Sequence, residues 1–206
     1  MQDQDYIKSQ VEGHRKTEIY ALTNPGYIRL MKHLHTKIPE AGFILEIGCN
    51  TGYECVMIQN QSRQVMGIDI GEDFVVKALD LGIEAAVMDM HEMNFKDGIF
   101  DCVYMNNTLE HAHTPAKVLS EIFRVLKKGG TIVICVPADY KNRDYISTQN
   151  WDPALHLWKP TPEEFKRTVT DAGFEITEYE EIDSESMFGL ENKASYNHYM
   201  VIVCKK

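Results

Sequence analysis

Residue types suited to ligand binding gather in the segment Glu46-Ile-Gly-Cys-Asn-Thr-Gly-Tyr53, directly after a short apolar run. Glu46 supplies a carboxylate, while Gly48 and Gly52 permit a tight turn in which a ligand can approach the backbone. Asn50 lies between them, and asparagine tolerates positive φ better than most residues. We therefore expect a positive φ at Asn50 or at an adjacent glycine. A helical pattern follows, whose first N–H groups are suited to a ligand carboxylate or phosphate.

Two more carboxylates end later apolar runs. Asp69 closes the run 63–69, about 20 residues beyond the loop, where nucleotide-binding folds place an acid on ribose hydroxyls. The alternative role for Asp69 is to cap the next helix. Asp89 closes the run 84–90. Because ligands bind outside the carboxyl ends of parallel strands, three acids there favour a ligand with hydroxyls, amines and positive charge.

Alternating strands and helices are needed to position these acids. We expect apolar or alternating strands at 43–47, 63–69, 84–90, 100–107, 131–137, 174–180 and 199–204. A helix over 27–34 should place Ile28, Met31 and His35 on one face. No helical pattern separates the last two strands, which predicts an antiparallel pair.

Other residues predict where two helices begin and end. Thr114-Pro115 is typical of a helix start, and Gly129-Gly130 is expected to end that helix. Thr161-Pro-Glu-Glu164 has the pattern of a capping box with proline at the first helical position, and Phe165 and Val169 should face the core.

The ordered segments LEIGCNTGY, GIDI, MDM, FDCVYMNNTLEH and VLSEIFRVLKKGGTIVICVP together resemble class I S-adenosylmethionine-dependent methyltransferases. The resemblance is nearest to the small-molecule group with a Leu-Glu-His turn after the fourth strand. It covers 43–137 well, and 160–176 and the last strand more weakly. Asn50 departs from the glycine usual in the family. The resemblance implies an α/β, Rossmann-like, doubly wound sheet of seven mostly parallel strands, with an antiparallel last strand and helices on both faces.

The resemblance also implies S-adenosylmethionine as cofactor and S-adenosylhomocysteine as product. Asp69 would accept from both ribose hydroxyls, and Asp89 from the adenine amine. Glu46 would brace the loop and contact the ligand indirectly. The implied cofactor-binding set is Glu46, Gly48, Cys49, Asn50, Gly52, Asp69, Ile70, Met88, Asp89, Met90 and Asn106. In this set Ile70 and Met88 flank adenine, the Met90 backbone reads the ring edge, and Asn106 lies beside the methionine portion.

His111 is the titratable residue that the family pattern places near the methyl group, as a general base. The alternative is a histidine that hydrogen-bonds only to backbone. The pair His111 and His113 lacks the further ligands that zinc requires, so no metal is expected.

A long aromatic segment, 138–160, leaves the fifth strand and predicts an acceptor site. The N-terminal helices of this family often close over the site. The candidate substrate residues are Tyr20, Tyr140, Trp151 and His156. In the alternative reading, Trp151 and Trp158 only fix the segment to the sheet.

The composition agrees with one methyltransferase domain over 1–206. Its expected parts are an N-terminal helical cap (1–40), a cofactor-binding core (43–137), a substrate loop (138–160) and a C-terminal helix with an antiparallel strand pair (161–206). The 206 residues carry a net charge of -10, and basic residues do not cluster beyond pairs such as Lys127-Lys128. We therefore expect a small-molecule acceptor, such as a sugar-like or other metabolite, and no nucleic acid.

The absence of long apolar runs and of a leader pattern predicts no membrane association. Five cysteines without a CxxC spacing fit reduced, cytoplasmic chemistry. The oligomeric state is left open.

Two other function classes stay open beside methyl transfer. A nicotinamide-dependent oxidoreductase would need G-x-G-x-x-G, and two of the three glycines are replaced, by Asn50 and Tyr53. A non-catalytic S-adenosylmethionine-binding subunit would keep the cofactor residues without catalysis.

Overall fold

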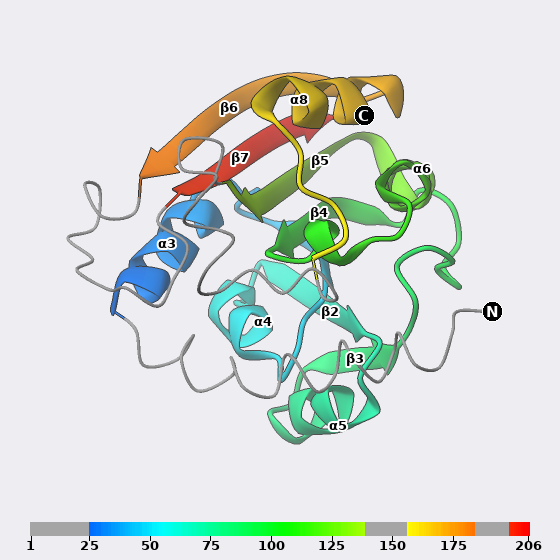
Figure 1. Cartoon of the computed structure of the whole chain (residues 1–206). Coiled ribbons are helices and arrows are strands. Elements are labelled where there is room, and N and C mark those ends of the chain that lie inside the picture. The colour runs from blue at the N-terminus through cyan, green and yellow to red at the C-terminus, as the bar shows by residue number, and fades with distance from the viewer. Residues whose placement is uncertain (1–24, 139–155, 184–197) are drawn as a thin grey trace.

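The computed structural model describes residues 25–138, 156–183 and 198–206 (Figure 1). Helices and strands alternate over most of this range. In chain order they are α3 Pro25–His35, β1 Gly42–Ile47, α4 Tyr53–Ile58, β2 Arg63–Asp69, α5 Glu72–Asp80, β3 Glu84–Val87, β4 Phe100–Asn106, the 3-10 turn η1 Leu109–His111, α6 Pro115–Val125, β5 Leu126–Pro137, α8 Pro162–Asp171, β6 Glu175–Asp183 and β7 His198–Lys205.

The strands form one seven-stranded sheet in the order β3-β2-β1-β4-β5-β7-β6. Strands β1 to β5 pair in parallel, whereas β7 pairs antiparallel with both β5 and β6. The chain reverses its order on the sheet between β1 and β4, and this type of crossover places ligands outside the carboxyl ends of parallel strands. The predicted fold class and the antiparallel pairing of the last two strands are confirmed.

Apolar side chains cover both faces of the sheet. Alternate strand residues point to opposite faces, so Ile44 and Tyr104 join the core beneath α3 and α4. Leu45 and Val103 join the other core, beneath α6 and α8. Figure 1 shows α3, α4 and α5 on one side of the sheet and α6 and α8 on the other. Central strands buried on both faces explain their continuous apolar runs.

Helix α6 ends earlier than the sequence suggested. It begins after Thr114 with proline at the first position, as predicted, but stops at Val125. The prediction that Gly129-Gly130 end the helix is wrong, because both glycines lie inside β5. The backbone N–H of Gly129 donates to the carbonyl of Lys206 (3.0 Å), so this extended stretch hydrogen-bonds to the end of the chain.

Helix α3 buries a different stripe from the predicted one. Its buried residues include Leu30, Met31 and Leu34, whereas Ile28 and His35 are only partly buried. The stripe is rotated because Leu30 and Leu34 pack against the sheet with Ile44 and Tyr104. Of the three residues predicted to share a face, Met31 is buried, and Ile28 and His35 are partly buried.

Ion pairs connect the end of α3 to the edge strand β6. Lys37 Nζ contacts Glu178 Oε1 (2.5 Å) and Glu180 Oε1 (2.9 Å), and His33 Nε2 contacts Glu180 Oε2 (2.8 Å). Helix α3 is thereby held against the β6 edge of the sheet.

The start of α8 follows the predicted capping box. Thr161 accepts from the backbone N–H of Glu164, whose carboxylate accepts from the Thr161 N–H. Phe165 and Val169 are buried against the core, which confirms the predicted apolar face.

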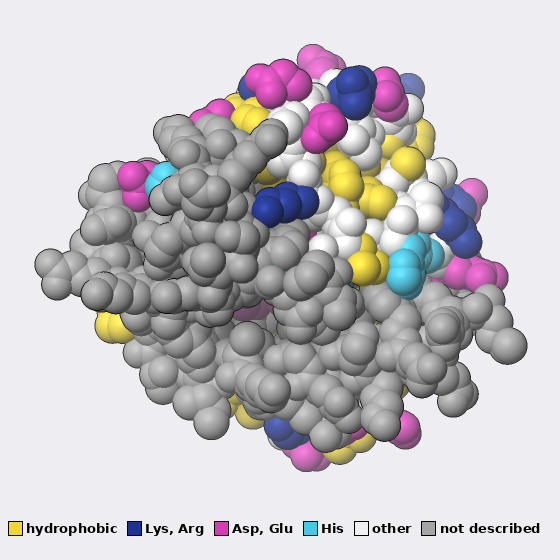
Figure 2. Space-filling view, in the orientation of Figure 1, with side chains coloured by type: hydrophobic (Ala, Val, Ile, Leu, Met, Phe, Trp, Pro, Cys, Tyr) yellow, Lys and Arg dark blue, Asp and Glu magenta, His cyan; other side chains and the backbone are white. Residues whose placement is uncertain are grey.

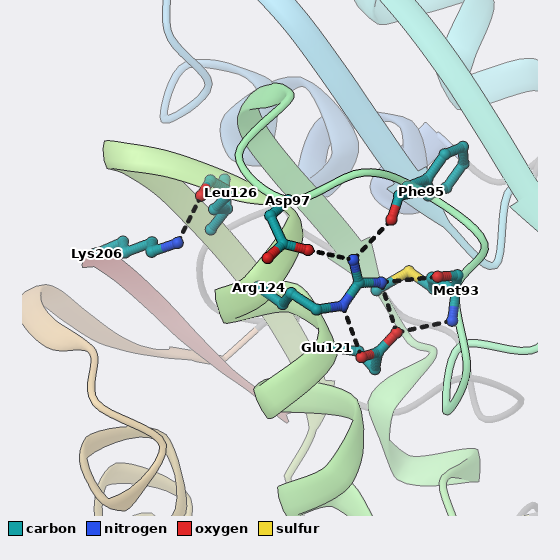
Figure 3. Close-up of polar contacts among 7 residues, drawn as sticks. All are labelled: Met93, Phe95, Asp97, Glu121, Arg124, Leu126 and Lys206. Carbon is teal, nitrogen blue, oxygen red and sulfur yellow. Dashed lines mark hydrogen bonds and ion pairs between the residues drawn. The ribbon is translucent and has the colours of Figure 1, made fainter.

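A cluster around Arg124 links α6 to the connection between β3 and β4 (Figure 3). Its guanidinium contacts the Glu121 and Asp97 carboxylates (2.8 and 2.9 Å) and donates to the Met93 and Phe95 carbonyls (2.7 and 2.6 Å). Glu121 Oε2 also accepts from the Met93 backbone N–H. The side chains of Arg124 and Glu121 thus satisfy four polar groups of an irregular segment.

Within the described residues, no helix is long and apolar enough to cross a membrane. Figure 2 shows basic and acidic side chains interspersed where the described surface is visible, toward α8 and β6. That face carries no continuous basic stripe among the residues described.

Candidate functional site

The loop between β1 and α4 turns through three residues with positive φ. They are Gly48 (78°), Asn50 (48°) and Gly52 (82°), which confirms the expectation for Asn50 and its neighbouring glycines. The backbone N–H groups of Gly48 and Cys49 both donate to the carbonyl of Ile68 (2.8 and 3.0 Å). The loop is therefore fixed to the end of β2.

Asp69 holds this loop and the next one together. Its Oδ2 accepts from the Asn50 N–H (2.9 Å), and its Oδ1 accepts from the Gly71 N–H (2.9 Å). The side chain of Asn50 in turn accepts from the Thr51 N–H (2.7 Å). The Asp69 carboxylate, which was predicted to accept from ribose hydroxyls, thus also positions the β1–α4 loop.

Gly48 and Gly52 lie where no side chain fits. A Cβ at Gly48 would come within 2.4 Å of Thr108 Oγ1, and one at Gly52 within 2.8 Å of the Ala78 Cβ. Thr108 follows β4 and Ala78 belongs to α5, so the loop is pressed against two other elements. The predicted requirement for glycine is confirmed at both positions, although the immediate neighbours are protein atoms.

Two buried polar atoms at the ends of β1 and β4 have no hydrogen-bond partner. Glu46 is 4% exposed and Asn106 is 9% exposed. Glu46 Oε2 and Asn106 Oδ1 are both unpartnered. Since buried polar groups are rarely left unpaired, these atoms indicate a place where a ligand completes the site. The Glu46 side chain hydrogen-bonds to Cys55 of α4, and the predicted bracing of the loop by Glu46 stays a prediction.

Glu54, in the first turn of α4, organises the polar side chains beside Asn106. Its Oε1 accepts from Asn106 Nδ2 (2.8 Å), and its Oε2 accepts from Tyr104 Oη (2.5 Å). His35 Nε2 lies 3.4 Å from the same Oε2. Asn106 Nδ2 also donates to Tyr27 Oη (3.0 Å). Residues from α3, α4 and β4 are joined in this way at the carboxyl edge.

Electrostatics keep several of these groups neutral. Burial, reinforced by the Glu54 charge, raises the pKa of Tyr27 and of Tyr104 well above the usual tyrosine value. Burial and the Glu54 and Asp69 charges likewise raise the pKa of Glu46 well above its usual range. A positively charged ligand group would favour the ionised form of Glu46.

The residues predicted to surround adenine follow β2 and β3, which are neighbours in the sheet. Ile70, Met88 and Met90 are partly buried, and the Met88 N–H donates to the Asp69 carbonyl (2.9 Å). Strand β3 ends at Val87, so Met88 to Met90 lie beyond it and not within it as predicted.

Asp89 forms hydrogen bonds with His91, two residues further along the same connection. Its Oδ1 accepts from the backbone N–H and from Nδ1 of His91, both at 2.8 Å. Burial opposes ionisation of Asp89, but these hydrogen bonds outweigh it and lower the pKa. Asp89 is therefore held as a carboxylate that can accept a further hydrogen bond.

The structure brings the predicted catalytic and substrate histidines together. The rings of His111 and His156 lie with centroids 4.8 Å apart and an interplanar angle of 31°. His111 Nε2 is 3.8 Å from Glu110 Oε1. Burial raises the pKa of Glu110 to about 8. His113, by contrast, is exposed, and its ring lies 6.3 Å from that of His91.

Three predicted substrate residues, Tyr20, Tyr140 and Trp151, lie outside the described residues. Trp158 is described, and it packs edge-on against Phe165 at 5.9 Å. For Trp158, the alternative reading of an anchor to the core is confirmed.

Glu54, Tyr104 and Glu110 belong to the site but were not predicted from the sequence. Tyr104 lies inside an apolar strand, and Glu110 was noted only as part of the Leu-Glu-His turn. Of these three, Glu54 could have been predicted from the sequence, because an acid in the first turn of the helix after a glycine loop faces the carboxyl edge of the sheet.

Comparison with known proteins identifies the family. Residues 20–179, most of the chain, match the family described as Methyltransferase domain. The chain therefore belongs to this methyltransferase domain family. A probable S-adenosylmethionine-dependent methyltransferase of Mycolicibacterium smegmatis is 30% identical over 137 residues, covering 65% of this chain and 52% of that protein. The chain spans about half or less of the length of the first curated relatives it matches.

Solved structures share the fold. A Thermotoga maritima S-adenosylmethionine-dependent methyltransferase, described as a possible histamine N-methyltransferase, aligns with a TM-score of 0.76 at 20% identity over 98% of this chain and 99% of that one. A Burkholderia thailandensis 1,6-didemethyltoxoflavin-N1-methyltransferase aligns with a TM-score of 0.71 at 18% identity, over 98% of this chain and 86% of that one.

Proposed function

We propose that this protein is an S-adenosylmethionine-dependent methyltransferase acting on a small molecule. One observation carries the proposal. Glu46 and Asn106 present unpartnered buried oxygens at the ends of adjacent strands, beside a loop with three positive φ angles. Buried acceptors at that edge suit the amino group and positive charge of the cofactor's methionine portion.

The residues present fit the rest of the cofactor. Asp69 would accept from the ribose hydroxyls while keeping the loop in place, and Asp89 would accept from the adenine amine. Ile70 and Met88 would contact the adenine faces, and the Met90 backbone its edge. Cys49 and the two loop glycines would let the backbone approach the ligand.

The bound cofactor supplies an electrophilic methyl group. The chain's own residues contribute alignment of the acceptor with that group and exclusion of water, which are the main sources of rate in such a transfer. His111 would hold or remove the proton of a hydroxyl or amine acceptor if the acceptor is protonated. Its ring is oriented by contact with His156.

A small acceptor is favoured by several observations. The net charge of -10 opposes binding to nucleic acid, and no membrane association is proposed. The Burkholderia protein is named for methylation of a small heterocycle, and the Thermotoga protein for a small amine. We propose an oxygen, nitrogen or carbon acceptor of that size, bound over η1 and the segment that includes His156.

Calorimetry with S-adenosylhomocysteine tests the cofactor site. Wild type is expected to bind with micromolar affinity, about -8 kcal/mol, and Asp69→Ala at least tenfold more weakly. The exposed Asp80 at the end of α5 provides a control, and Asp80→Ala should bind as wild type does. Because Asp69 also holds the loop, Asp69→Asn, which retains one acceptor oxygen, should lose less than Asp69→Ala. Equal affinity of wild type and Asp69→Ala would contradict the assignment, and binding of NADH instead would favour the oxidoreductase.

Methyl transfer separates an enzyme from a cofactor-binding subunit. A panel of small amines, phenols and sugars is incubated with cofactor labelled in the methyl group, and labelled product is measured. With an accepted substrate, His111→Ala should lower turnover while cofactor affinity stays within about twofold. Cofactor binding without transfer to any acceptor would favour the non-catalytic subunit.

A further inference from the structure

Glu110, His111 and His156 form a compact set of metal-ligating side chains. Their ligand atoms all lie within 4.8 Å of one another. Glu110 is 1% exposed and His111 is 6% exposed, whereas His156 is partly buried. The three residues come from two segments, η1 and the stretch that precedes α8.

Described backbone contacts hold the two segments together. The N–H of Trp158 donates to the carbonyl of Glu110 (2.9 Å), which fixes the 156–158 stretch against η1. Trp158 packs on Phe165 of α8, and Leu109 of η1 is buried in the same core. Core packing of Trp158 and of Leu109 therefore keeps His156 close to Glu110.

The unpartnered carboxylate of Glu110 independently indicates a ligand site beside the two histidines. Neither of its carboxylate oxygens has a hydrogen-bond partner. A buried carboxylate is costly unless it is protonated, paired or bound to a cation. A cation between Glu110 and the two imidazoles would compensate that charge.

We propose that Glu110, His111 and His156 bind a divalent transition-metal ion. Two imidazole nitrogens and one carboxylate oxygen suit Zn²⁺, Co²⁺, Mn²⁺ or Fe²⁺ better than Mg²⁺ or Ca²⁺, which prefer oxygen ligands. Ligand bonds of about 2.0–2.2 Å place neighbouring ligand atoms of a tetrahedral site about 3.4 Å apart. The three atoms, which lie within 4.8 Å of one another, must therefore approach by as much as about 1.4 Å when the ion binds. With three protein ligands, at least one coordination position stays open to water or to an oxygen of another molecule.

The earlier expectation of no metal rested on the pair His111 and His113. The exposed His113 is not part of the ligand set, and the ligands that the pair lacked come from Glu110 and from His156, 45 residues along the chain from His111. The inference depends on these three side chains and not on the proposed cofactor site. In the metal-bound protein His111 is a ligand, so the proton-accepting role proposed for it above applies to the metal-free protein.

Co²⁺ titration tests the site in the full chain, stripped of metal by a chelator and free of any affinity tag. Visible absorption reports Co²⁺ coordinated by the protein, and calorimetry with Zn²⁺ gives stoichiometry. Wild type is expected to bind one equivalent of each ion. Glu110→Gln and His156→Ala are expected to weaken Co²⁺ binding at least tenfold and to lose the absorption band.

His113→Ala is the matched control, because it removes a histidine two residues from His111 but outside the set. Its Co²⁺ affinity should equal that of wild type. Glu110→Gln also controls for folding: it removes a buried charge at constant shape, so the metal-free melting temperature should not fall, while the rise caused by Zn²⁺ should disappear.

Absence of saturable Co²⁺ binding by wild type, or equal affinity in Glu110→Gln, would overturn the proposal. Parallel calorimetry with S-adenosylhomocysteine keeps the two proposals apart. Loss of cofactor binding with intact Co²⁺ binding would count against the proposed function alone, and the reverse would count against the metal site alone.

Discussion

The partly exposed Arg124 cluster and the carboxyl edge of the sheet differ in how their charged side chains are paired. Around Arg124, two carboxylates and two carbonyls meet one guanidinium, so each charge has a partner (Figure 3). Hydrogen bonding to Arg124 lowers the pKa of Glu121. At the carboxyl edge, Glu46 and Glu110 are more deeply buried than Glu121, yet they keep unpartnered oxygens.

This difference indicates that the paired charges around Arg124 stabilise the fold, whereas Glu46 and Glu110 are placed to bind a ligand. Leaving a buried carboxylate uncompensated opposes folding, and the rest of the core must offset that cost. Such exceptions to local consistency are expected at functional sites. Arg124 should therefore matter for stability and little for binding, whereas Glu46 should show the reverse.

The largest expected effect comes from removing Arg124. Arg124→Ala leaves Glu121, Met93 and Phe95 without their shared donor, and should lower the free energy of unfolding by about 3 kcal/mol. Urea unfolding measures the change. The exposed Lys128 on the adjoining strand offers a control, since Lys128→Ala should change stability by less than about 0.5 kcal/mol. A loss below about 1 kcal/mol for Arg124→Ala would show that the cluster is dispensable.

The loop residue Asn50 should respond to backbone conformation. Its φ of 48° is accessible to glycine but poorly so to a β-branched residue. Asn50→Val should cost about 1–2 kcal/mol of stability and weaken cofactor binding, whereas Asn50→Gly should bind within about twofold of wild type. Thermal melting and calorimetry on both variants provide the check. Equal behaviour of valine and glycine would mean that the loop does not depend on positive φ.

Glu46→Gln sharpens the comparison directly. Because burial holds the Glu46 carboxyl neutral in the unliganded protein, an amide of the same shape should leave that form as stable as wild type or more stable. Affinity for S-adenosylhomocysteine should fall about tenfold, which is about 1.4 kcal/mol. If Glu46→Gln instead destabilised the unliganded protein and left the affinity unchanged, Glu46 would belong with the structural charges.

The smallest effect is expected in the pH dependence of stability, where Glu180 and Glu46 should act in opposite directions. Burial opposes ionisation of Glu180, but bonds from His33 and Lys37 outweigh it and lower the pKa to about 2. Its stabilising contribution is present above the unfolded value of about 4.5 and is lost as pH falls toward 2. We expect less than about 1 kcal/mol, because the pair is partly exposed.

For Glu46 the folded pKa is raised, so the native state binds the proton more tightly and stability falls as pH rises above about 4.5. Urea unfolding between pH 2.5 and 7 should show the acid-side loss reduced in Glu180→Gln and the decline toward neutral pH reduced in Glu46→Gln. Superimposable curves for wild type and both variants would contradict these assignments.

Much of the fold was predictable because its signals are local. The glycine loop, the positive φ at Asn50 and the capping box at Thr161 depend on residues a few positions apart. The strand segments follow from apolar runs whose burial on both faces is fixed by the parallel sheet. The end of α6 was mispredicted because β5 pairing extends back to Leu126 and overrides the local glycine signal.

The sequence by itself determined the family, the sheet and the loop on which a cofactor would lie, since these depend on hydrophobic period and on backbone conformation. Only the tertiary structure decided which side chains meet. The contact of Tyr104 with Glu54 joins residues 50 positions apart, and Glu110 reaches His156 only because Trp158 docks on η1. Neither follows from spacing, because a side-chain contact between distant segments is fixed by how the elements pack and not by any pattern along the chain.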